Sequence, residues 1–197
     1  MNPDQNQHRR NRLLAALRPR DYALLEPHLQ IVPIGEGEFL HLPGNEIEQA
    51  YFLHRGIVSL MTISEDGDAI ATASVGSEGA IGTIAGTAFV RAFTRAMVQA
   101  PGVASRIAVS HLLRAVSKSE AINDLFTRYH MALMCQVQQT SLCNSVHDAT
   151  SRLSRLLLVL SEQAEDPLPT VFAGAESRTS SSMKAGRPFF SSIPFLN

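Results

Sequence analysis

The chain of 197 residues is 45% hydrophobic and 18% charged, with a formal net charge of −1. This hydrophobic content supports a packed core, and the near-neutral balance gives no overall basic field for nucleic acid or an anionic membrane. Residues 1–12 are polar and no run of eighteen apolar residues exists. We therefore expect no signal peptide, no membrane span and a cytoplasmic location.

The two cysteines, Cys135 and Cys143, lie eight residues apart on one predicted helix. Their separation of about 12 Å is too long for a disulfide within the chain, so we expect free thiols. His130, Cys135, Cys143 and His147 all lie on or just beyond this helix, and Cys143 and His147 share a face. Two ligands do not make a zinc site, however, and two cysteines do not hold an iron–sulfur cluster. We expect no metal, no cofactor and, because no catalytic spacing occurs, no enzyme.

Residues 1–29 are predicted to form a helical lead-in. Leu13, Leu14 and Leu17 share one helical face, Pro19 interrupts it, and Asp21 is suited to cap a second short helix.

Residues 30–110 consist of short runs of β-branched and apolar residues separated by glycine-containing turns. The Asp66-Gly67 pair predicts a β-hairpin, and residues 54–56 and 101–102 also read as turns. Many short strands at this spacing predict an antiparallel sandwich or barrel-like roll, and with the helices an α+β fold. The predicted strands are 31–34, 38–42, 50–53, 57–63, 69–75, 95–99 and 102–109, with a glycine-rich insertion at 76–88.

Residues 111–147 are predicted to hold a short helix, capped by Ser110, and then a long one. The stretch from Ala121 to Val146 lacks Pro and Gly, and its length of roughly 40 Å exceeds what a small domain needs. A seam at 3-4 spacing predicts a homodimer, weak or specific because its lower part is polar. The alternative is a helix packed only on its own domain. The seam consists of Ile122, Leu125, Tyr129, Ala132, Gln136, Gln139 and Cys143.

Residues 148–163 follow as a hinge region with a further helical pattern, and the predicted hinge residues are Asn144, His147, Arg152 and Arg155. Residues 164–197 are rich in serine, contain scattered proline and show no sustained period, which predicts a disordered tail.

Three segments resemble the Crp/Fnr family of bacterial transcription regulators: YFLHRGIVS at 51–59, VGSEGAIG at 75–82, and residues 143–157 from Cys143 into the hinge. The resemblance covers roughly residues 13–163. It implies a cyclic-nucleotide-binding-like β-roll (a double-stranded β-helix) as sensory domain over 30–110, a dimerisation helix over 111–147 and a small-molecule effector. It also implies a DNA-binding winged helix-turn-helix that starts within 148–163.

The predicted effector site departs from the cyclic-AMP-binding members of the family. Those members carry a Glu directly after the Gly of the insertion helix, where this chain has Thr83 after Gly82. Their Arg precedes a small hydroxyl residue and Ala, whereas this chain reads Thr94-Arg95-Ala96, so strand alternation points Arg95 away from the site. We expect an effector other than a cyclic nucleotide, with a cyclic-nucleotide-binding module as an alternative. The candidate effector-binding residues are Gly76, Glu78, Gly79, Gly82, Thr83, Thr94 and Arg95.

Two of these assignments have a simpler alternative. Glu78 and Arg91 could be polar contacts to the effector or solvated loop residues. The three glycines could present backbone N–H groups to an anion or only form a turn.

Residues 164–197 contain no pair of helices that could form a helix-turn-helix, and their three basic residues are balanced by three acidic ones. We expect a truncated, frame-shifted or naturally shortened family member whose 197 residues do not bind DNA. Its function would be the sensory and dimerisation part of a Crp/Fnr-like transcription regulator. The alternative is a stand-alone protein-interaction module that forms homodimers or mixed dimers.

Overall fold

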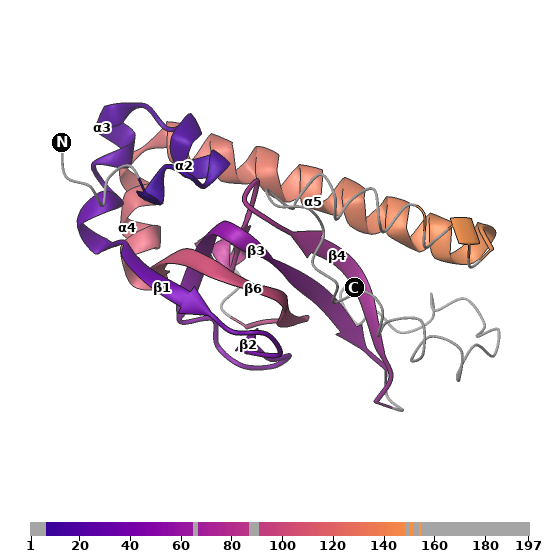
Figure 1. Ribbon diagram of the computed structural model, residues 1–197. Coiled ribbons are helices and arrows are strands. Elements are labelled where there is room, and N and C mark those ends of the chain that lie inside the picture. Colours follow the sequence, from indigo (N-terminus) through magenta and orange to yellow (C-terminus); the bar gives the residue numbers. More distant parts are fainter. Residues whose placement is uncertain (1–6, 65–66, 87–90, 149, 152–153, 155–197) are drawn as a thin grey trace.

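The structure is a computed structural model that describes residues 7–64, 67–86, 91–148, 150–151 and 154 (Figure 1). The expectations for Arg152, Arg155 and residues 164–197 concern residues outside this part of the chain. Among the described residues, no helix has both the length and the apolar character that a membrane span requires.

The centre of the molecule is an antiparallel sheet in the order β1-β6-β3-β4, with β2 also paired to β6 and β5 to β3. Every pairing is antiparallel, which confirms the α+β class and the predicted roll. β3 and β4 pair antiparallel on either side of the hairpin predicted at Asp66-Gly67, of which Asp66 lies outside the described residues. The strands are β1 (Gln30–Ile34), β2 (Phe39–His41), β3 (Gln49–Ile63), β4 (Ala69–Val75), β5 (Ala80–Ile81) and β6 (Arg95–Ala108).

The turns predicted at 54–56 and 101–102 are wrong, because β3 and β6 run through these positions as continuous paired strands. The register shifts on both sides of Arg55 and again after Ile57, so the predicted turns are β-bulges that face each other. Gly56 has φ +93°, and a Cβ there would lie 2.8 Å from the carbonyl oxygen of Ala100. Glycine at this position therefore allows the two backbones to approach closely.

The lead-in forms short helices that pack beside α4 and the beginning of α5 (Figure 1). The N-cap predicted at Ser110 is wrong. β6 continues to Ala108, and Ala108 is the N-cap of α4, which already includes Ser110. The helical elements are α2 (Arg12–Ala16), α3 (Pro19–Tyr22), η1 (Glu26–His28), η2 (Thr83–Gly86), α4 (Val109–Lys118) and α5 (Glu120–Val146).

Asp21 does not cap α3, which begins at Pro19 with Arg18 as its N-cap. The buried carboxylate of Asp21 instead accepts a hydrogen bond of 2.8 Å from the hydroxyl of Ser119. Ser119 is the N-cap of α5 and accepts from the N–H of Ile122 at 3.3 Å. One side chain of the lead-in thus supports the start of the long helix.

Two apolar clusters lie on opposite faces of the sheet. The outer cluster packs the lead-in, α4 and the first half of α5 against Phe52 and Ile107, and the rings of Phe52 and Phe126 lie 6.1 Å apart. The roll cluster fills the inside with Leu53, Val75 and other strand residues, and Leu133 of α5 packs against it. Helix α5 therefore contacts both faces before it extends beyond the sheet (Figure 1).

Candidate functional site

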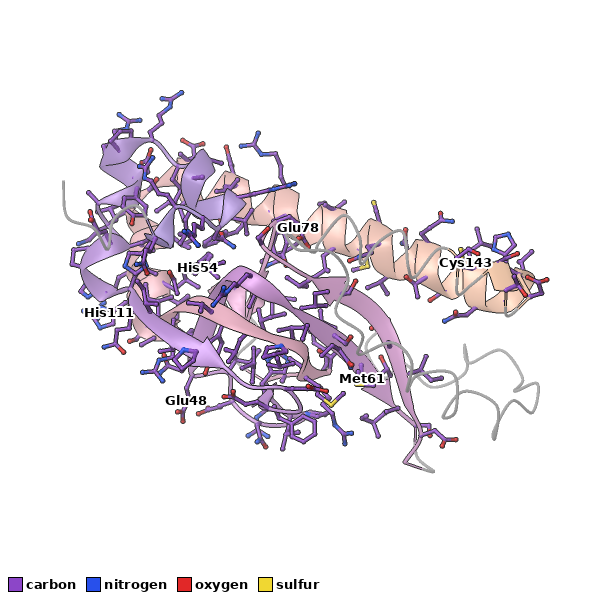
Figure 2. All side chains as sticks on the ribbon, viewed as in Figure 1. Glu48, His54, Met61, Glu78, His111 and Cys143 are labelled. Carbon is purple, nitrogen blue, oxygen red and sulfur yellow. The ribbon has the colours of Figure 1, made fainter. Side chains whose placement is uncertain are left out.

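The turn between β4 and β5, residues 76–79, lies against α5, with Glu78 close to the helix (Figure 2). The N–H of Gly79 donates to the carbonyl of Gly76 at 3.1 Å, and the N–H of Gly76 donates to the Glu78 carboxylate at 2.9 Å. Two of the three candidate anion-binding N–H groups are thus engaged within the 76–79 turn. An anion could reach them only by displacing these bonds.

Gly82 follows β5 with φ +81°, and a Cβ there would lie 2.5 Å from the carbonyl oxygen of Gln49. Its lack of a side chain is required for the close approach of this segment to β3. The glycine therefore has a structural explanation that needs no ligand.

Tyr129 of α5 bonds to both backbone groups of one β5 residue, Ala80. Its hydroxyl donates to the carbonyl of Ala80 at 2.8 Å and accepts from the N–H of Ala80 at 3.1 Å. Burial raises the pKa of this phenol above its ordinary value, with a further contribution from the Glu78 carboxylate, so the hydroxyl stays protonated. Gly79 makes room for it, because a Cβ there would lie 2.7 Å from the Tyr129 hydroxyl.

His130, the next residue of α5, contacts Thr83, which follows β5 in the chain. Its Nε2 lies 3.0 Å from the hydroxyl of Thr83, which is buried at the start of η2. Burial lowers the pKa of His130, so the neutral imidazole is favoured. Adjacent side chains of α5 thus bond to Ala80 and Thr83, within the segment 76–83 that carries most of the candidate effector residues, and we call Tyr129 and His130 the α5 clamp.

Asn11 connects the same turn to the lead-in. Its side-chain amide donates to the carbonyls of Leu53, Ser77 and Gly79 at 2.7–3.2 Å, while its carbonyl oxygen caps α2. Asn11 therefore bonds the 76–79 turn to the lead-in, while the α5 clamp bonds the residues that follow the turn, Ala80 and Thr83.

Thr94 and Arg95 occupy a different environment from Gly76–Thr83. The Thr94 hydroxyl lies 3.5 Å from Nε2 of His41, whose pKa is lowered to about 4 by burial. The Arg95 guanidinium lies over the ring of Phe39 at 5.3 Å. Its neighbour Ala96 belongs to the roll cluster, so strand alternation directs Arg95 away from the inside of the roll.

The residues of the predicted dimer seam do not share one exposed face. Ile122 is fully buried in the outer cluster and has no surface to offer a partner, and Leu125 and Tyr129 pack against the same cluster. Cys143 is buried, while Gln136 is half-buried and Ala132 and Gln139 are exposed. The first half of α5 therefore packs on its own domain, as the alternative to a dimer helix predicted.

The exposed apolar face of α5 lies about one residue, or 100°, around the helix from the predicted seam. We call it the outer stripe, and the described residues with large exposed apolar side chains on it are Met131, Met134, Leu142 and Val146, all exposed by more than half. Cys135 is exposed beside them.

The hinge begins at the end of α5, where Asn144 and His147 are exposed. The N–H of His147 donates to the carbonyl of Cys143 at 3.1 Å and closes the helix. No group of three potential metal ligands occurs among the described residues.

Sequence reasoning missed the roles of Asn11, Thr83 and the α5 clamp in holding the turn. Asn11 precedes Leu13, Leu14 and Leu17 on one helical face, which is an N-cap signal, but its amide contacts depend on distant strands. The spacing of Tyr129 fits the dimer seam, and spacing does not reveal which side of a helix faces the sheet.

No family model and no curated protein matches the chain. Solved structures do share its fold. The global regulator CLP of Xanthomonas campestris, described as responsive to c-di-GMP, superimposes with a TM-score of 0.63 at 14% identity, over 78% of this chain and 77% of its own. The sensor domain of the transcriptional regulator DNR from Pseudomonas aeruginosa gives a TM-score of 0.51 at 15% identity, over 73% of this chain and 91% of the domain.

A regulatory subunit of a cAMP-independent protein kinase A from Trypanosoma brucei has a TM-score of 0.56 at 15% identity. It covers 64% of this chain, which spans only 45% of the subunit. These neighbours are regulatory proteins by description, and at such identities the likeness establishes the fold. The fold implied by the sequence resemblance is confirmed.

Proposed function

We propose that this chain is the sensory and dimerisation part of a Crp/Fnr-like transcription regulator in the cytoplasm. The roll would respond to a small-molecule effector, and α5 would pair with a second copy of the chain. The observation that carries the proposal is the α5 clamp, because it joins the candidate effector segment directly to the helix that would form the dimer. The sequence resemblance and the shared fold of bacterial regulators support it.

The clamp offers a physical route for the signal. Tyr129 and His130 bond to Ala80 and Thr83, so a ligand that displaced this segment would break or strain contacts on α5. A rigid helix transmits such a change along its length to the hinge around Asn144 and His147. We propose that Arg152 and Arg155 complete the hinge.

The dimer is proposed to form through the outer stripe, since exposed apolar side chains at helical spacing are typical of a helix that pairs. Sedimentation velocity at tens of micromolar should show a dimer. Leu142→Asp should weaken it by about tenfold or more, because a two-fold axis brings two like charges together. Asn144→Asp is the matched control: Asn144 is exposed two residues further along α5, about 160° around the helix, and should leave the dimer intact. A wild-type monomer at these concentrations would remove dimerisation from the proposal.

We do not expect these 197 residues to bind duplex DNA specifically. In residues 164–197, the positive charges of Arg178, Lys184 and Arg187 are balanced by Glu165, Asp166 and Glu176. A mobility-shift assay with a randomised duplex library should show no selective retention. Selective retention of one sequence would assign DNA binding to this chain and contradict the expectation.

The effector is proposed to be a molecule other than a cyclic nucleotide, because the carboxylate that would bond the ribose is replaced by Thr83 and Arg95 packs on Phe39. A cyclic nucleotide at one hundred times its dissociation constant would stabilise the fold by about 2.7 kcal/mol. Thermal unfolding with cyclic AMP or cyclic GMP should show no such stabilisation, and its appearance would restore the cyclic-nucleotide alternative.

A further inference from the structure

A second polar cluster lies on the outer face of the sheet, opposite the roll cluster. Leu53 and Ala104 pair across β3 and β6 and point into the roll, so His54 and Ser105, each one residue further along its strand, point outward. His54 lies between the sheet and the N-terminal helices (Figure 2). Nδ1 of His8 is 2.5 Å from the Ser105 hydroxyl, and Nε2 of His54 is 2.6 Å from it.

The hydroxyl of Ser105 has one proton and two acceptor lone pairs, so it can donate to at most one of the two imidazoles. When His8 donates and His54 accepts, Nδ1 of His54 carries a proton and can donate to a further group. All three side chains are more than nine-tenths buried, and burial strengthens the hydrogen bonds between them. Burial lowers the pKa of His54 to about 4, and the charges of His8 and Arg10 contribute to the shift.

A pocket of about 180 Å³ opens beside this cluster and is lined by Gln7, Arg10, His54, Arg55 and Val103. The β-bulge at Arg55 places that residue opposite Val103, which brings the two arginines to one cavity from distant parts of the sequence. Within the described part of the chain, no carboxylate pairs with Arg10 or Arg55. The neighbouring Arg9 instead stacks on Tyr22 at 4.6 Å.

The lining is therefore rich in hydrogen-bond donors and carries two positive charges without a compensating carboxylate. Guanidinium groups bind phosphate oxygens in pairs, and an imidazole N–H and an amide can satisfy the remaining oxygens. The volume is below the roughly 300 Å³ at which pockets for drug-sized ligands begin, which favours a small anion over a nucleotide.

We propose that this pocket binds a phosphate group, held by Arg10 and Arg55, with Nδ1 of His54 and the amide of Gln7 as further donors. The ligand is inorganic phosphate or the phosphate of a small monoester.

The site has a structural consequence for the rest of the molecule. A bound phosphate fixes residues 7–10 on β3, directly before Asn11, which holds the 76–79 turn. Phosphate binding on the outer face of the sheet would then affect the position of the 76–79 turn, in addition to any effector bound in the roll. This consequence rests on the proposed function, whereas phosphate binding does not.

Isothermal titration calorimetry on the full chain tests the site with inorganic phosphate, glycerol 3-phosphate and, as a monovalent control, acetate. We expect phosphate or the monoester to bind and acetate to bind much more weakly. Arg55→Gln and Arg10→Gln should each weaken binding by at least about tenfold, because each removes a charge-assisted contact. Both arginines are exposed, so these variants should fold as the wild type does.

Arg128→Gln is the matched control, since Arg128 is exposed on α5 and outside the pocket. It should bind as the wild type does. Tighter binding of inorganic phosphate than of the monoester assigns the free anion, and the reverse order assigns the ester. The proposal is overturned if neither phosphate ligand binds, if acetate binds equally well, or if Arg55→Gln binds unchanged. Sedimentation of the same samples reports the dimer separately, so failure of this site is distinguishable from failure of the proposed function.

Discussion

The two halves of α5 are built in opposite ways. In the first half, Ile122 and Phe126 are fully buried and the α5 clamp is bonded to the roll. In the second half Cys143 is buried, but the larger apolar side chains of Leu142 and Val146 are 54% and 69% exposed. One continuous helix thus belongs to the core at one end and to the surface at the other.

This difference allows a single helix to serve both parts of the proposed function, the response of the roll and dimerisation. Burial of the first half makes its position depend on the roll, because it cannot move without disturbing the outer cluster. The exposed apolar side chains of the second half offer area that a partner can remove from water.

Truncation of one apolar side chain in each half of α5 should cause very different losses in the free energy of unfolding. Phe126→Ala should lower the free energy of unfolding by roughly 3–5 kcal/mol, because it leaves a cavity against Phe52 in the outer cluster. Leu142→Ala, measured at concentrations where the chain is monomeric, should change it by less than about 0.5 kcal/mol. Urea unfolding checks both values, and equal losses for the two variants would contradict the division.

The contact between the 76–79 turn and the clamp should be intolerant of one added methyl group. Gly79→Ala places a Cβ 2.7 Å from the Tyr129 hydroxyl and 2.8 Å from Val75, and should destabilise the chain by about 1–3 kcal/mol. Gly35→Ala is the control, because its nearest neighbouring atom is 3.8 Å away. A near-neutral Gly79→Ala in urea unfolding would mean that the turn and α5 are not held tightly together.

Acid should destabilise the β-roll. The pKa values of His41 and His54 are lowered to about 4 by burial, whereas the unfolded chain titrates near 6.5. Below pH 6.5 the unfolded state therefore binds more protons. The free energy of unfolding should fall between pH 6.5 and about 4, by at most about 1.4 kcal/mol per pH unit for each group. His54→Gln should reduce this slope, and an unchanged slope would count against a neutral, buried His54.

Sequence patterns predicted the roll and the long helix because both are local signals. Alternating residues give β1 and β4 almost residue by residue, and the absence of Pro and Gly defines α5. The predicted turns around Gly56 and Gly102 failed for a non-local reason: each glycine serves a bulge that exists only because β3 and β6 pair there.

The site was less predictable than the fold. The segment around Gly79 was identified from its motif, yet its bonds to Tyr129 and Asn11 join positions far apart in the sequence. The dimer seam illustrates the same limit, because apolar spacing in α5 fits two faces about 100° apart. Only packing shows that Ile122 lies inside and Leu142 outside.

The most direct test of the account measures whether the clamp influences the distant half of the helix. Tyr129→Phe removes both hydrogen bonds to Ala80 without changing the outer stripe. Sedimentation equilibrium should give a dimer dissociation constant at least about threefold weaker than that of the wild type. Tyr51→Phe, which removes a hydroxyl from the roll, should leave it unchanged. An identical dissociation constant for Tyr129→Phe and the wild type would contradict coupling between the roll and the dimer.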